Sequence, residues 1–158
     1  MLLYHGSNVQ VSNPQIIDSD RRLDFGKGFY LTSSFEQAKR WAELTVKRRG
    51  SGKGCVSVFE FDESRLSELK ILQFTQAQKE WLEYVTLNRK NQEIPNDDYD
   101  IVIGPVANDK TMPVISLYFS GVYDIDETIK RLMPQKLHDQ YTFRTEVALK
   151  ALCFLEVR

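Results

Sequence analysis

Residues 24–41 hold the side chains whose types and spacing could do chemistry. The turn at 26–28, which reads Gly-Lys-Gly, can take backbone angles closed to other residues and can approach a ligand without interference from a Cβ atom. Tyr30 follows on a short alternating segment, and Ser33 or Ser34 can cap the helix that comes next. A tyrosine presented between a sharp turn and a helix start is an arrangement that suits a nucleotide site.

Two blocks, residues 4–7 (Tyr-His-Gly-Ser) and 25–30 (Phe-Gly-Lys-Gly-Phe-Tyr), resemble the NAD-binding core of the ADP-ribosyltransferases. The resemblance is to the branch of diphtheria toxin and the poly(ADP-ribose) polymerases, which carries a His-Tyr-Glu triad. It implies that His5 and Gly6 meet the ribose and the nicotinamide amide, and that Tyr30 stacks on the nicotinamide. In the polymerase-like members a second aromatic wall lies eleven residues further, which is Trp41 here. The implied NAD-binding set is His5, Gly6, Ser7, Lys27, Gly28, Tyr30 and Trp41.

The third triad position falls on a glutamine. Residues 139–143 (Asp-Gln-Tyr-Thr-Phe) read as the late strand on which the family places its glutamate, and Gln140 occupies that slot. Glu146, six residues later, is the next acid along the chain and the alternative third member. The expected catalytic set is therefore His5, Tyr30 and Gln140, with Glu146 as the alternative to Gln140.

A glutamine changes the chemistry expected at that slot. It can accept and donate hydrogen bonds, but it carries no charge and is not a general base. Elongation of poly(ADP-ribose) is therefore not expected, and transfer needs a nucleophile activated by Glu146, by Asp139 or by the acceptor itself. The same substitution is compatible with a domain that binds NAD without turnover.

The whole chain also resembles a bacterial group of the same clan, known as domain of unknown function 3990. The supporting residues are 80–82 (Glu-Trp-Leu), 88–89 (Asn-Arg) and 99–109. Members of this group often sit beside a small partner protein. The resemblance therefore implies a toxin with a small antitoxin protein as its partner.

The main hypothesis from these features is an NAD-dependent mono-ADP-ribosyltransferase. It would use NAD as substrate, modify a macromolecular acceptor that is a protein or a nucleic acid, and act as the toxin of a bacterial toxin-antitoxin pair. The alternatives are an NAD glycohydrolase, which uses water as the acceptor, and a non-catalytic NAD-binding module. An RNA 2′-phosphotransferase, which is related in fold, would want basic residues where Tyr30 and Gln140 stand.

Composition limits the remaining possibilities. At 158 residues the chain is expected to form one domain, residues 1–158, that buries a sizeable core. Hydrophobic residues at 42% and charged residues at 27% are ordinary for a soluble protein, and no apolar run approaches the roughly 20 residues that cross a bilayer. Because the N-terminus lacks the features of a leader, we expect a cytoplasmic protein without membrane contact. Cys55 and Cys153 lack metal-ligand spacing, so we expect buried free thiols and no metal site.

Positive charge gathers in one helix and the loop after it, although the net charge is −1. Two interpretations stay open. The charges either form a solvated helix end that the helix dipole favours, or they bind NAD phosphates or a nucleic acid. The residues concerned are Lys39, Arg40, Lys47, Arg48, Arg49 and Lys53.

The elements that must position these residues are short. Residues 18–24, including Asp20 and Asp24, are expected to form an exposed lead into the glycine turn that could cover bound NAD. Short strands without regular strand-helix alternation favour an α+β fold. The resemblance implies an ADP-ribosyltransferase-like split β-sheet core with a few short helices and NAD in the cleft between the sheets. Strands are predicted at 1–5, 29–32, 55–61, 69–74, 99–106, 140–145 and 152–157, and helices after Ser34, at 76–90, at 124–132 and briefly around 146–150.

Overall fold

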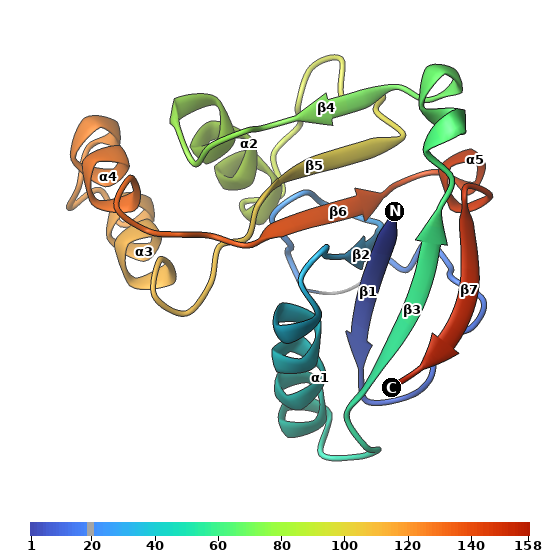
Figure 1. The fold of residues 1–158 in the computed structure, drawn as a ribbon. Helices are drawn as coiled ribbons and strands as arrows, with labels where there is room; N and C mark the ends of the chain where they lie inside the picture. Colours follow the sequence, from blue (N-terminus) through green and yellow to red (C-terminus); the bar gives the residue numbers. More distant parts are fainter. Residues whose placement is uncertain (19–20) are drawn as a thin grey trace.

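The computed structural model describes residues 1–18 and 21–158 and shows an α+β fold, as expected from the sequence. Its strands form two sheets (Figure 1). The first sheet has the order β1-β3-β7, with β1 (Leu2–Ser7), β3 (Cys55–Phe61) and β7 (Leu152–Val157), all antiparallel. The second has the order β2-β6-β5-β4, with β2 (Phe29–Leu31), β6 (Asp139–Phe143), β5 (Ile101–Pro105) and β4 (Ile71–Gln73), of which β4 and β5 are parallel.

The helices lie outside the two sheets. α1 (Phe35–Arg49) runs beside β1, while α2 (Lys79–Arg89), α3 (Met112–Phe119) and α4 (Ile125–Leu132) lie on the side of the second sheet (Figure 1). α2, α3 and α4 connect successive strands of the second sheet. A 3-10 helix, η1 (Glu63–Glu68), follows β3, and α5 (Glu146–Leu149) joins β6 to β7. No helix in the described ranges combines the length and the apolar character that crossing a membrane requires.

Two apolar clusters hold the second sheet from its two faces. One joins it to the first sheet, where Phe29 meets Phe59 edge-on at 5.6 Å and Phe61 meets Phe143 at 5.4 Å between ring centroids. The other covers the opposite face with residues from the helices and from the glycine turn. It includes Phe25, Trp81, Val102, Ile115 and Leu132, all buried. Because side chains alternate along a strand, Phe29 and Leu31 enter the first cluster and Tyr30 packs against the second.

α1 begins and ends as its sequence predicts. Ser34 is the N-cap, and its side chain accepts a hydrogen bond from the Gln37 N–H at 3.2 Å. Gly50 ends the helix in the left-handed conformation with φ of 66°, and three basic residues fill the last turn, where they complement the helix dipole.

Gly6 allows α1 to lie directly on β1. A Cβ atom built on Gly6 would fall 1.8 Å from the Ala38 carbonyl oxygen and 2.9 Å from the Ala42 nitrogen. Any other residue would therefore push the helix away from the strand. The first half of α1 is thereby fixed over the end of β1 that carries His5.

The structure differs from the predicted helices and from the predicted burial of the thiols in three places. α3 was not predicted, because Met112–Phe119 is apolar on most sides and shows no helical period, although Pro113 near its start is a helix signal. η1 was also missed. The expectation of buried thiols is wrong for Cys153, which is exposed on the outer strand β7, and Cys55 is only half-buried; both are free.

Candidate functional site

His5 stands where the two sheets separate. The bridge between Tyr4 and Thr32 links β1 to β2, with hydrogen bonds of 2.9 and 3.0 Å. In the same antiparallel register the next hydrogen-bonded pair would be Gly6 and Tyr30. His5 takes the place of that pair, because its Nδ1 lies 2.8 Å from the Tyr30 carbonyl oxygen.

This hydrogen bond decides the form of the imidazole. A carbonyl oxygen can only accept, so Nδ1 carries the proton and Nε2 is left as an acceptor. The ring also stacks on Phe29 at 4.4 Å between centroids. Burial lowers the pKa of His5 below its ordinary value, and the bond to the Tyr30 carbonyl offsets part of that effect. His5 is therefore a neutral, oriented hydrogen-bond acceptor.

Gly6 is buried beneath α1, next to His5 on β1. Backbone groups alternate in direction along a strand, so Gly6 points its N–H and C=O the same way as Tyr4, away from β3. Among the hydrogen bonds of the described residues, none involves either of these two groups. A donor and an acceptor side by side on one edge match the acceptor and donor of a carboxamide.

Tyr30 is fixed by the turn that precedes it. Its hydroxyl donates to the Gly26 carbonyl at 2.6 Å and accepts from the Phe25 N–H at 3.1 Å. Burial raises the pKa of Tyr30, and the nearby charge of Asp24 raises it further, so the phenol stays protonated. Gly26 makes this turn possible, because it adopts a φ of 77°. At Gly28 a Cβ atom would lie only 2.7 Å from the Phe143 carbonyl oxygen, so only glycine fits there without a shift.

Gln140 lies on the same face of the second sheet as Tyr30. Tyr30 pairs with Thr142 across β2 and β6, and Gln140 is two residues before Thr142. Its Nε2 donates to Asp24 Oδ2 at 2.9 Å and to the Pro105 carbonyl at 3.1 Å. Both partners are acceptors, so the amide must turn its NH₂ group toward them and leave Oε1 as its free end. No described residue donates to Oε1.

Asp24 is buried, so the expectation of an exposed Asp24 is wrong; Asp20 lies outside the described residues. Its carboxylate accepts three hydrogen bonds. Oδ1 accepts from Arg89 Nε at 2.7 Å and also forms an ion pair with Arg89 Nη2 at 2.6 Å, while Oδ2 accepts from Gln140 and from the Ala107 N–H at 3.1 Å. A buried carboxylate needs this full set of partners. No feature of the sequence distinguishes Asp24, which is buried, from the charged residues that precede it.

Asp139 is committed to the start of α1. Its Oδ1 accepts from Thr32 Oγ1 at 3.1 Å and from the Ser33 N–H at 2.8 Å, and its Oδ2 accepts from Ser33 Oγ. These bonds tie the beginning of β6 to the residues between β2 and α1. Asp139 is therefore positioned to hold the fold rather than to take a proton from an acceptor.

The remaining expected site residues occupy varied positions. Trp41 is half-buried and lies one helical turn beyond Ala38, the residue that covers Gly6. Ser7 is buried at the end of β1. Lys27 is exposed at the tip of the turn and lies 3.9 Å from Asp18. Glu146 is exposed at the start of α5, beyond the end of β6 opposite to Gln140 (Figure 1).

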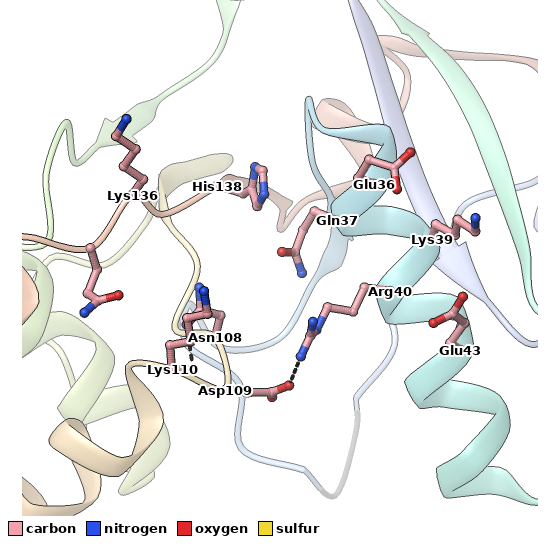
Figure 2. A pocket seen from close by; sticks show the side chains of 11 residues that line it. Glu36, Gln37, Lys39, Arg40, Glu43, Asn108, Asp109, Lys110, Lys136 and His138 are labelled. Atoms are coloured by element: carbon pink, nitrogen blue, oxygen red, sulfur yellow. Dashed lines mark hydrogen bonds and ion pairs between the residues drawn. The ribbon is translucent and has the colours of Figure 1, made fainter.

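The larger described cavity, of about 490 Å³, lies between α1, the loop after β5 and the segment before β6 (Figure 2). Gln37 and Arg40 project into it from α1, and Arg40 forms an ion pair with Asp109 across it. His138 is exposed and lines it two residues before Gln140. Its volume falls in the usual range for small-molecule sites. The full lining is Glu36, Gln37, Lys39, Arg40, Glu43, Asn108, Asp109, Lys110, Gln135, Lys136 and His138.

The structure thus brings His5, Gly6, Tyr30 and Gln140 to one region but does not make them line the cavity. Tyr30 and Gln140 are covered by the turn and by Asp24, while Gly6 is covered on one side by α1. The cavity reaches this region through Gln37, next to Ala38, and through His138. The cavity residues of α1 and of the loop after β5 were not singled out as a pocket from the sequence, because only folding brings them together.

In the parts of the chain that the structure describes, no group of three or more histidine, cysteine, aspartate or glutamate residues is placed to hold a metal ion.

Comparison with known protein families identifies a family for this chain. A family described as a protein of unknown function (DUF3990) matches residues 1–154, nearly the whole chain. No curated protein matches the chain.

The lowered pKa of His5 predicts a pH dependence of stability. The unfolded chain takes up a proton at His5 near pH 6.5, before the folded chain does, so the free energy of unfolding should fall as pH drops below about 6.5. Gln at position 5 can still donate to the Tyr30 carbonyl but does not titrate. Urea unfolding at about pH 7.5 and about pH 5.5 should therefore show a smaller pH effect for His5→Gln than for the wild type. His138→Gln, at the second of the two histidines, is the matched control and should behave as wild type. Equal pH effects in His5→Gln and wild type would contradict this account of His5.

The Asp24 network predicts that Gln140→Glu destabilises the protein, although it restores the residue type of the resembled triad. A second carboxylate would face Asp24 and the Pro105 carbonyl without a proton to donate. We expect a loss of about 3 kcal/mol in urea unfolding at neutral pH, and a smaller loss at acidic pH, where the new carboxyl is protonated. Adding Asp24→Asn should recover part of the loss, and the exposed Gln135→Glu should cost little. A Gln140→Glu protein as stable as the wild type would show that the Asp24 contact is not formed.

Proposed function

We propose that this chain, which belongs to the DUF3990 family, is an NAD-dependent mono-ADP-ribosyltransferase that modifies a macromolecular acceptor. The proposal rests on the chain's own residues, because the family description assigns no function. One observation carries it: His5 binds the Tyr30 carbonyl, so the N–H and C=O of the buried Gly6 have no described partner on the side of β2.

The backbone N–H and C=O of Gly6 fit a nicotinamide carboxamide. The amide N–H of Gly6 would donate to the carboxamide oxygen, and its carbonyl would accept from the carboxamide NH₂. Trp41, one turn along α1 from Ala38, would supply a flat wall for the ring. Ring binding at this place would need little movement of β1, because Gly6 is already held between β3 and α1. Preformed geometry of this kind lowers the entropy that must be lost on binding.

The adjoining cavity suits the rest of NAD. Its mixed lining offers cations for the pyrophosphate, among them Lys39, Lys110 and Lys136, and amides for the riboses. Arg40 is held by Asp109. An extended dinucleotide could therefore run from the Gly6 edge into the cavity along the first turns of α1.

Catalysis would break the bond between C1′ of the ribose and the nicotinamide nitrogen, and the bonding electron pair would leave with nicotinamide. Positive charge then builds on the ribose. His5 Nε2 and Gln140 Oε1 are both acceptors, and each can hold a ribose hydroxyl while this charge develops. The acceptor then forms a bond to C1′ and loses its proton to water or to a base on the acceptor. Because Gln140 cannot take that proton, the proposal limits the enzyme to a single transfer.

Two parts of the proposal rest on resemblance alone. These are the role as a toxin in a bacterial toxin-antitoxin pair and the small antitoxin protein as its partner. The cytoplasm is the compartment in which such a pair would act.

A second candidate function, NAD binding without turnover, is favoured by the charge-free Gln140 and by the engagement of Asp139 elsewhere. An NAD glycohydrolase would use the same residues with water as acceptor.

The test is an assay with NAD labelled in its adenylate half and bacterial lysate, with and without nuclease. We expect label on a macromolecule, reduced about 100-fold in His5→Asn, which loses the oriented acceptor. Gln73→Ala, an exposed position at the end of β4, is the control and should leave labelling unchanged. Nicotinamide release without label would replace the transferase with the glycohydrolase. NAD binding without release would replace it with the binding module.

A further inference from the structure

Gln37 is a buried amide that projects into the larger cavity. Only 6% of its surface is exposed, and its side chain points into the cavity from the first turn of α1 (Figure 2). The Ser34 cap uses its backbone N–H, but no hydrogen bond among the described residues involves its side-chain amide. Buried polar groups in folded proteins are nearly always hydrogen-bonded. The Gln37 amide is therefore available to a ligand in the cavity.

Arg40 projects into the same cavity, three residues further along α1. Residues three apart lie on one face of a helix, so the Gln37 amide and the Arg40 guanidinium can meet one ligand. The guanidinium is paired with the Asp109 carboxylate across the cavity, but both of these side chains are more than half exposed. An ion pair with this exposure adds little to stability and can be exchanged for an anion of a ligand.

The turn that carries Asp109 is held by contacts other than this ion pair. Asn108 Oδ1 accepts from the N–H groups of Lys110 and Thr111 at 2.9 and 3.1 Å. Thr111 is fully buried, and its Oγ1 accepts from the Asn108 N–H at 2.9 Å. Asp109 therefore stays in place when the pair is broken, whereas the long side chain of Arg40 can turn toward a ligand.

The lining of the cavity favours a ligand that is polar throughout. Small-molecule sites are usually lined by apolar and aromatic side chains, whereas every described residue of this lining carries a polar or charged side chain. None of these residues has a phenyl, phenol or indole ring on which a nucleobase would stack. Sugar and phosphate groups, rather than a base, therefore fit this cavity.

A guanidinium and an amide on one face match a ribose that carries phosphates. The planar guanidinium of Arg40 can donate two parallel hydrogen bonds to one phosphate group. The Gln37 amide has both a donor and an acceptor, so it can bind a ribose hydroxyl, which also has both. The two side chains thus supply complementary contacts for the two parts of a ribose phosphate.

We propose that Gln37 and Arg40 bind the ribose and pyrophosphate of NAD in the larger cavity. Gln37 holds a ribose hydroxyl, and Arg40 leaves Asp109 to bind the pyrophosphate. Asp109 then competes with the ligand for Arg40, so its carboxylate weakens binding. The choice of NAD as the source of these groups rests on the proposed function, because a free ribose phosphate would make the same contacts.

The test is isothermal titration calorimetry of the full chain with ADP-ribose, which carries the ribose and the pyrophosphate but no nicotinamide. Arg40→Gln should weaken binding about tenfold, because a charged contact to phosphate is lost. Asp109→Asn should instead strengthen binding about two- to fivefold, since it frees Arg40. In the Arg40→Gln background the same change at Asp109 should have little effect. Lys150→Gln and Glu93→Gln remove the same charges at exposed positions outside the lining and should bind as wild type.

Gln37→Met tests the amide separately from the charge. It replaces a buried amide that has no described partner by an apolar side chain of similar size, so stability in urea unfolding should be equal to that of the wild type or higher. Binding of ADP-ribose should nevertheless weaken about three- to tenfold, because a hydrogen bond to the ligand is lost. A less stable Gln37→Met protein with unchanged binding would assign the amide to the fold and contradict the proposal.

The outcomes separate this inference from the proposed function. Wild-type binding of ADP-ribose in both Gln37→Met and Arg40→Gln, or no binding at all, would overturn the inference, while labelling of a macromolecule would still support the transferase. Binding that depends on both residues, without transfer of label, would support the site and remove the transferase. Binding of ribose 5-phosphate without binding of ADP-ribose or NAD would overturn NAD as the ligand and assign the cavity to a free sugar phosphate.

Discussion

The buried carboxylate of Asp24 holds the candidate site together. Its three hydrogen bonds and its ion pair reach α2 through Arg89, the loop after β5 through Ala107 and the strand β6 through Gln140, while Asp24 itself begins the glycine turn. A buried charge without such partners would be strongly destabilising, so these segments can pack only in an arrangement that supplies them. The position of the turn, and with it the position of Tyr30, follows from this requirement.

The same carboxylate gives a physical reason for glutamine at the third triad position. A glutamate there would bring a second negative charge against Asp24 in a region with little water, whereas an amide can donate to Asp24 and still present an oxygen on its other end. The site therefore keeps a hydrogen-bond acceptor at this position while giving up a base. Because glutamine cannot accept the proton, the proposed chemistry is a single transfer in which the proton acceptor lies outside the chain.

Local patterns in the sequence predicted more of the fold than of the site. The Ser34 cap, the strand at 55–61 and the helix within 76–90 follow from short-range rules, and the structure confirms them. α3 was not predicted, because an almost wholly apolar segment shows no helical periodicity. The burial of Asp24 was not predicted, because its partners are 65 to 116 residues away in the sequence and no local signal marks a carboxylate that long-range contacts will bury. Arg89 and Ala107 lie in the segments that carry the family resemblance, which indicates that those segments support the Asp24 network.

The central claim is that NAD binds with its nicotinamide against the backbone N–H and C=O of Gly6, which have no described partner on the side of β2. The most direct measurement is an NMR titration of the ¹⁵N-labelled protein with NAD, in which the amide resonance of Gly6 is followed beside that of the exposed Gly121. The account predicts a large, saturable shift of the Gly6 amide, because its N–H gains a hydrogen bond, and no shift of Gly121. A titration in which NAD leaves the Gly6 resonance in place would contradict the claim.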